Sequence, residues 1–233
     1  MAATYAPADA FYFSKTMIKN MPLDTIQTRL LDDVNKIIWM AAPWRWTLGS
    51  LPTTALVSAT QDYAIAIPAD YLYTTNLYMT KGDDPSRDLA VVGALPTTVG
   101  QIGQPGFATI TGTPAMNGTL RVYPKPGTLV GTSTVYGLYK KTSPVITVQN
   151  SYTAGTLVMD DEWFWVYTAG VLWLSYLYAD DSRAGSGNAE KRAAQVSGQK
   201  AIFEEGLLQM KEREKLPIIN IPGAARDQKN TEL

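Results

Sequence analysis

The fold is decided by residues 160–216, which read DDEWFWVYTAGVLWLSYLYADDSRAGSGNAEKRAAQVSGQKAIFEEGLLQMKEREKL. Three acidic residues open this stretch, and acidic side chains favour the unpaired N–H groups and the positive dipole of a helix N-terminus. From Trp163 to Tyr178, thirteen of sixteen residues are apolar or aromatic. Because no continuous polar face remains, the sequence predicts a helix covered on nearly every side, where Gly170 allows a close approach.

A second helix is predicted after the polar loop 179–187, with Asn188 as its N-cap. Apolar residues recur in it mostly three or four positions apart, and charged residues fill the surface between them. The apolar positions are Ala189, Ala193, Val196, Phe203, Leu207 and Met210. A short loop between two such helices predicts an antiparallel hairpin. The first helix has more apolar surface than the second can cover, so it needs a further partner.

That partner is predicted near the N-terminus, where Asp24 and Gln27 have the spacing of a capping box. A helix is expected to run from there to about Met40, and a shorter one over residues 8–19. The apolar stripe of the longer helix consists of Ile26, Leu30, Val34, Ile37 and Ala41. This stripe is expected to pack on the apolar helix after Asp160.

The tripeptide Trp44-Arg45-Trp46 follows this helix. We interpret it as two core or boundary aromatic residues with an arginine between them. A stacking platform for nucleic acid is the alternative, but it would need neighbouring basic residues, and the nearest one, Lys36, is isolated.

Residues 51–159 are rich in Thr, Val, Tyr, Gly and Pro, with short alternating runs separated by turns. This pattern predicts a β-sandwich or barrel. The expected strands are Ala55–Ser58, Tyr63–Ile67, Asn76–Thr80, Asp88–Val92, Phe107–Thr111, Thr119–Tyr123, Ser133–Tyr139 and Val145–Val148. Turns are expected at Lys81–Pro85, Met116–Gly118 and Pro124–Gly127.

The predicted fold class is therefore α+β. A helical bundle formed by residues 1–47 and 158–216 is expected to carry an inserted, sandwich-like or barrel-like β module over residues 48–157. Residues 217–233 are expected to form an extended C-terminal arm.

The composition excludes several kinds of chemistry. The 233 residues include no cysteine and no histidine, which removes disulfides, thiolate nucleophiles and the commonest general base and metal ligand. We therefore predict no enzyme, no catalytic residue, no metal and no cofactor. A net charge of −1 argues against a protein that binds nucleic-acid phosphates tightly.

Acidic pairs and glycine-rich turns offer no stronger site. We interpret Asp32-Asp33 as the solvated side of a helix, Asp83-Asp84 as a turn, Asp160-Asp161 as a helix start and Asp180-Asp181 as a loop rather than as metal or acid–base sites. Glycines between 103 and 114 lack the lysine of a phosphate-binding loop.

No signal peptide or membrane span is expected. The N-terminus lacks a basic region followed by an apolar run. The apolar helix from Trp163 to Tyr178 would span roughly 24 Å against about 30 Å of hydrocarbon, so we interpret it as a core helix.

A series of short motifs carries a family resemblance. After the helix that ends in Trp44-Arg45-Trp46 come Ile67–Tyr71, Gly103–Pro105, Leu120–Pro126 (LRVYPKP) and Tyr136–Lys141 (YGLYKK). The acidic-capped apolar helix and the Asp180-Asp181 loop follow. In this order the motifs resemble the head-to-tail adaptor proteins of tailed bacteriophages, also called connector or neck proteins.

The resemblance implies a structural virion protein of the neck or tail, assembled in the host cytoplasm. It implies a ring of about twelve copies between the portal protein and the tail, with a central channel through which DNA passes without specific binding. The implied partners are the portal, tail proteins such as nozzle, tail-tube or fibre proteins, and other copies of the chain, but no membrane.

The C-terminal arm is the candidate portal-binding site. Two prolines bracket an apolar segment that has no core of its own, which predicts burial against another chain or against the chain's own domain. The candidate residues are Pro217, Ile218, Ile219, Asn220, Ile221 and Pro222. The resemblance implies that such an extension reaches the portal.

A second function class stays open. The chain could be a monomeric β-sandwich binding module for carbohydrate or protein on a helical base, with Tyr71, Tyr73 and Tyr78 exposed in its loops.

Overall fold

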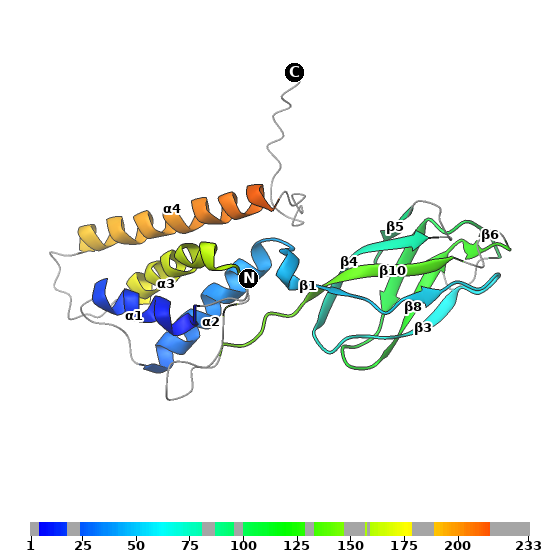
Figure 1. Ribbon diagram of the computed structural model, residues 1–233, viewed down its shortest axis with the longest axis horizontal. Helices are drawn as coiled ribbons and strands as arrows, with labels where there is room; N and C mark the ends of the chain where they lie inside the picture. The colour runs from blue at the N-terminus through cyan, green and yellow to red at the C-terminus, as the bar shows by residue number, and fades with distance from the viewer. Residues whose placement is uncertain are drawn as a thin grey trace, which may run out of the picture. The chain divides into compact units, whose positions relative to one another are not determined.

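Helices and strands occupy separate parts of the chain, as the α+β prediction requires (Figure 1). The computed structural model describes residues 5–17, 24–80, 87–95, 100–128, 133–146, 157, 159–178 and 189–214. Spatial contacts divide the chain into two units. The helical unit comprises Met1–Trp44 with Val145–Leu233, and the β unit comprises Arg45–Pro144.

The helical unit contains the helices that the sequence predicts. They are α1 (Pro7–Met17), α2 (Asp24–Ala41), α3 (Phe164–Tyr178) and α4 (Ala189–Arg213), and the 3₁₀ turn η2 (Asp161–Trp163) precedes α3. The acidic run 160–162 thus forms the approach to α3, and Trp163 closes the 3₁₀ turn with an N–H bond to the Asp160 carbonyl (3.0 Å).

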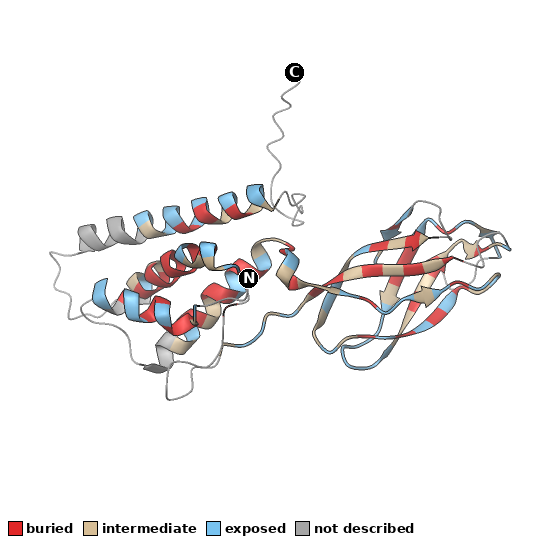
Figure 2. Cartoon of the chain, in the orientation of Figure 1, coloured by how far each residue is buried: buried red, intermediate tan, exposed pale blue. Residues whose placement is uncertain are grey.

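Helix α3 is the central element of this unit, because α1, α2 and α4 all contact it. Most of its length is buried (Figure 2). Its buried apolar residues are Val166, Tyr167, Ala169, Val171, Leu172 and Leu174. Trp165 and Leu177 remain 41% and 44% exposed, so the expectation of cover on nearly every side is wrong at these two positions.

The predicted packing of α2 on α3 is confirmed. Tyr167 donates a hydrogen bond from its buried hydroxyl to the Leu31 carbonyl (2.9 Å), and its burial raises the pKa of the phenol well above the ordinary value. The apolar stripe needs one correction: Ile38 is buried and Ile37 is exposed. Leu30, Val34 and Ile38, spaced four residues apart, are all buried, and Val34 lies beside Gly170 of α3.

Close approaches of the helices occur at two glycines. A Cβ added at Gly170 would lie 2.7 Å from Val34 of α2 and 2.9 Å from Phe203 of α4. A Cβ added at Gly206 of α4 would lie 2.7 Å from Val166 of α3. Gly170 therefore allows the close approach of neighbouring helices that the sequence predicts.

The β unit begins with a 3₁₀ turn, η1 (Arg45–Thr47). Its strands are β1 (Leu48–Ser50), β2 (Thr54–Ala55), β3 (Asp62–Ala66), β4 (Tyr71–Thr80), β5 (Arg87–Val91), β6 (Ile102–Gly103), β7 (Phe107–Thr111), β8 (Asn117–Tyr123), β9 (Lys125–Pro126) and β10 (Thr134–Lys141). All predicted strands except Val145–Val148 overlap one of these.

One curled sheet forms most of the β unit, in the order β1-β10-β4-β5-β7-β8-β3, with β2 also paired to β10 (Figure 1). Neighbouring strands are antiparallel except β5 and β7, which are parallel, and β6 and β9 form a separate parallel pair. Alternate residues face one core, which includes Tyr63, Ile65, Leu77, Leu89, Leu120, Val122 and Val135. Among the described residues the module is thus one curled sheet with a separate two-stranded pair, rather than two stacked sheets.

A buried lysine lies where the β unit begins and ends. Lys140 of β10 is paired with Leu48 of β1 and is 1% exposed. Its Nζ donates to the Thr47 hydroxyl (2.6 Å). Burial lowers the pKa of Lys140 to about 8, because the charged form loses its hydration.

The substitution Gly170→Ala tests the helix contacts. Alanine gains helix propensity of up to about 1 kcal/mol, but overpacking against the buried Val34 and Phe203 costs about 1 to 3 kcal/mol. We expect a net loss of about 1 kcal/mol or more in urea unfolding. Gly198→Ala on α4 is the control, because no atom lies within 4 Å of its added Cβ. Stabilisation by both substitutions would contradict the close approach.

The pH dependence of unfolding tests the burial of Lys140. Between pH 8 and pH 10 the unfolded chain keeps the lysine proton and the folded chain releases it, so the free energy of unfolding rises with pH. We expect Lys140→Met to remove this rise and to stabilise the protein at pH 7 by about 1 to 3 kcal/mol. Parallel stability curves for the two proteins would contradict the lowered pKa.

Candidate interaction surfaces

The predicted portal-binding residues, Pro217 to Pro222, lie outside the described residues. The last described residue is Glu214, whose N–H donates to the Met210 carbonyl (3.1 Å). Helical hydrogen bonding therefore continues to Glu214. In the sequence, the C-terminal segment follows directly after the last turn of α4.

The last turn of α4 is joined to the start of α3. The Arg213 guanidinium bonds to the Glu162 carboxylate and lies 5.5 Å from the centre of the Trp163 ring. Earlier in α4, near its middle, Lys200 lies 5.9 Å from the centre of the ring of Trp173, which is in the second half of α3. The end of α4 thus meets the beginning of α3, which confirms the predicted antiparallel hairpin.

Helix α1 carries an exposed apolar surface. Tyr12, Phe13 and Met17 are 48%, 48% and 57% exposed, while Phe11 and Ala10 of the same helix are buried. Aromatic side chains that remain exposed on a helix are typical of interaction surfaces. This surface is a candidate for contact with another chain.

Three tyrosines considered for a carbohydrate site do not form one platform. Tyr71, Tyr73 and Tyr78 all lie on strand β4 rather than in loops, so the loop prediction is wrong. Tyr71 packs against the core of the β unit, and its hydroxyl bonds to Thr74 (2.9 Å). Tyr78 instead packs against Tyr136, its partner on β10, with the two rings tilted and their centres 5.7 Å apart.

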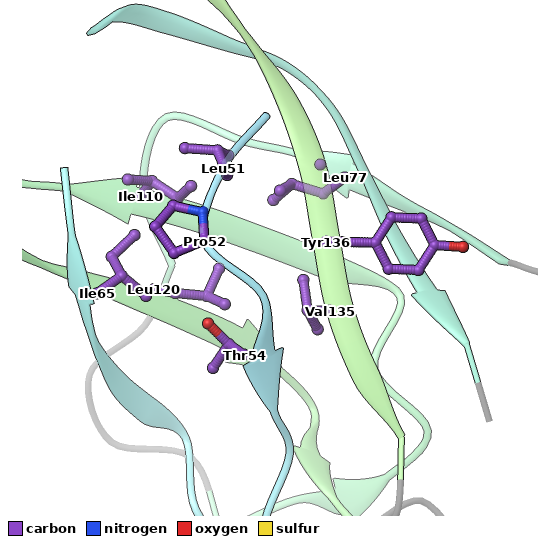
Figure 3. Close-up of a pocket in the computed structure, with 10 residues that line it drawn as sticks. Leu51, Pro52, Thr54, Ile65, Leu77, Ile110, Leu120, Val135 and Tyr136 are labelled. Carbon is purple, nitrogen blue, oxygen red and sulfur yellow. The ribbon is translucent and has the colours of Figure 1, made fainter. Parts of the chain in front are cut away.

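The β unit has a small apolar pocket (Figure 3). Leu51 and Pro52, from the segment between β1 and β2, lie opposite side chains of β3, β7 and β8. Its lining residues are Leu51, Pro52, Thr54, Ile65, Leu77, Ile110, Leu120, Val135, Tyr136 and Gly137. These residues include no carboxylate, lysine or arginine, and their one ionisable group is the Tyr136 phenol, whose ring points away from the other lining side chains in Figure 3.

The acidic pairs have structural roles where the structure describes them. The prediction that Asp32 lies on the solvated side of its helix is wrong, because its side chain is only 13% exposed. It accepts hydrogen bonds from the Ile146 N–H (3.1 Å) and from Lys36 (2.5 Å), and this bond raises the pKa of Lys36. Val145 and Ile146 follow β10, which ends at Lys141, and form no strand, so the strand predicted at Val145–Val148 is wrong at these two residues. Thr147 and Val148 lie outside the described residues.

The remaining acidic residues show no ligand cluster. Asp33 forms a 3.8 Å ion pair with the exposed Arg29. Asp83-Asp84 and Asp180-Asp181 lie outside the described residues. Across the described ranges, no group of three or more acidic side chains is arranged to hold a metal ion.

Trp44 of the Trp-Arg-Trp segment is fully buried, and its Nε1 donates to the Ile38 carbonyl (2.5 Å). A ring with no exposed face cannot stack on a base. Trp46 is partly buried and Arg45 is exposed, so the boundary-aromatic interpretation is confirmed for both tryptophans.

None of the described helices combines the length and the apolar character needed to cross a bilayer.

The comparison with protein families finds one match. The SU10 adaptor protein family matches residues 21–220, which include most of both units. The chain therefore belongs to the SU10 adaptor protein family. Membership indicates a structural adaptor role in a bacteriophage particle, in agreement with the resemblance seen in the sequence. A search of curated proteins gives no match.

The neighbouring residues Asp32 and Asp33 provide a matched test of the carboxylate that bonds to Ile146. We expect Asp32→Ala to lower the free energy of unfolding by about 1 to 2 kcal/mol, because a backbone N–H loses its acceptor. Asp33→Ala should change it by less than about 0.5 kcal/mol, because an exposed ion pair contributes little. Both substitutions change helix propensity equally. Equal effects in chemical unfolding would contradict the role of Asp32.

Proposed function

We propose that the protein is a head-to-tail adaptor that forms a ring of about twelve copies between the portal and the tail. The observation that carries the proposal is the family match over residues 21–220, since it spans both the helical and the β unit. In this proposal the four helices work as one bundle that carries the β module. The protein acts by assembly in the virion neck and catalyses no reaction.

The charge balance supports a channel through which DNA slides. The chain has 20 basic and 21 acidic residues, so it lacks the basic excess of proteins that hold nucleic-acid phosphates. A basic lining would retain DNA during ejection, whereas a near-neutral ring lets it pass. DNA is therefore a passenger in the proposed channel and not a ligand.

The proposed contact with the portal is the C-terminal arm, with Ile218, Ile219 and Ile221 as its apolar anchors. Burial of one isoleucine contributes about 1.5 to 3 kcal/mol, and ordering the arm offsets part of this gain. Many copies in a ring multiply the contact. The opposite side of the ring is proposed to bind a tail protein of the nozzle, tube or fibre type.

Ring formation is tested by mixing the purified protein with portal-bearing heads or isolated portals and imaging by negative-stain electron microscopy. We expect a monomer or a mixture of small species alone, seen by light scattering, and closed rings on the portal. A stable dimer or tetramer that forms no ring on portals would contradict the proposal, because neither species is a step towards a ring of high cyclic symmetry.

Removal of residues 217–233 tests the arm in the same assay. We expect the shortened protein to keep its melting temperature within about 2 °C and to lose attachment to portals. A triple substitution of Ile218, Ile219 and Ile221 by serine is the matched variant of full length. Normal attachment of both variants would place the portal contact elsewhere, and failure to fold would assign the arm to the chain's own core.

A further inference from the structure

We propose that Arg213 is a positioning residue for portal attachment: it holds the last turn of α4 on the start of α3 and so fixes the point from which the C-terminal arm leaves. The inference rests on the proposed function of the arm. It adds a residue that touches neither the portal nor the tail but decides where the arm can reach.

The contacts of Arg213 join two places that are 51 positions apart in the sequence. The guanidinium bonds to the Glu162 carboxylate of η2 and lies 5.5 Å from the centre of the Trp163 ring. Trp163 is only 6% exposed, so the indole gives the arginine a fixed surface. A planar cation suits both partners, because it can bond to a carboxylate at its edge and stack on an aromatic face.

The body of α4 is held by other residues. Phe203 and Met210 are 2% and 0% exposed, and Gly206 lies against Val166 of α3. After Met210 the burial ends, since Lys211 to Glu214 are partly or fully exposed. Loss of Arg213 should therefore release the last turn without separating α4 from α3.

The position of this turn matters because the arm follows it directly. Ile218 is five residues beyond Arg213, so an extended chain carries it at most about 18 Å from the arginine Cα. A fixed origin confines the isoleucines to a small volume, which raises their effective concentration at a docked portal. A frayed turn enlarges that volume and adds ordering cost to each attachment.

The experiment compares Arg213→Met and Glu162→Gln with Lys200→Met in the full-length chain. Lys200 makes a cation–aromatic contact with Trp173 of α3 near the middle of α4, 13 positions before Arg213 in the sequence. We expect Arg213→Met and Glu162→Gln to weaken portal attachment roughly three- to tenfold. All three melting temperatures should stay within about 2 °C of the wild-type value.

Two further measurements separate positioning from general stability. Hydrogen exchange should become faster at residues 211–214 in Arg213→Met and remain unchanged there in Lys200→Met. The chain has no cysteine, so the double variant Glu162→Cys/Arg213→Cys can be joined by a short bismaleimide. The cross-linked double variant should attach to portals as strongly as the wild type does. Without the cross-link, it should attach as weakly as Arg213→Met does.

The variant that lacks residues 217–233 distinguishes the two levels of the proposal. Normal attachment of this variant would overturn the arm as the portal contact, and with it the positioning role. If it fails to attach while Arg213→Met attaches as well as Lys200→Met, the arm proposal stands and the role of Arg213 is overturned. A cross-link that does not restore attachment overturns it as well.

Discussion

The structure of the helical unit depends on one constraint: helix α3 has almost no polar face and must be covered by other helices. Its neighbours come from both ends of the chain, since α1 and α2 precede the β unit and α4 follows it. The packing leaves little freedom at Gly170, where side chains of α2 and α4 meet. Burial also requires internal partners for polar groups, and Tyr167 meets this need with the Leu31 carbonyl. Covering one apolar helix therefore brings together segments more than 100 residues apart.

Features that depend on a local sequence pattern could be predicted from the sequence. Features that depend on residues distant in the sequence could not. The apolar run of α3, the capping-box spacing at Asp24 and the alternation of the strands are local, and the predicted elements other than the strand at Val145–Val148 appear near their expected places. The edge of the α2 stripe could not be decided from the sequence, because spacings of three and of four residues are both helical and only the packing of the folded unit buries Ile38 rather than Ile37. Asp32 was misjudged for the same kind of reason, since its partner Ile146 is 114 positions away. Strand order and the parallel β5–β7 pair also depend on pairing across long separations.

The candidate site shows the same division. The composition of the arm could be seen in the sequence, and the family resemblance agrees with the family match. The contact between Arg213 and Glu162 was missed, although a signal existed. In an antiparallel hairpin the start of the first helix lies beside the end of the second. Acidic residues at the start of α3 and basic residues at the end of α4 are therefore expected to attract each other. The structure is needed to show which of these charged residues form the contact, namely Arg213 and Glu162.

The pairing of Leu48 with Lys140 has a consequence for the exchange of the β unit. It places the first and last strands of the β unit side by side, so the unit enters and leaves the helical framework through neighbouring residues. An inserted segment whose two ends lie side by side can be replaced by another segment with adjacent ends. The helical unit then needs no rearrangement, because the two points at which the chain leaves and re-enters it stay where they are. The adjoining ends thus make the β unit a separable insert, which can be replaced as a whole without rebuilding the helical unit.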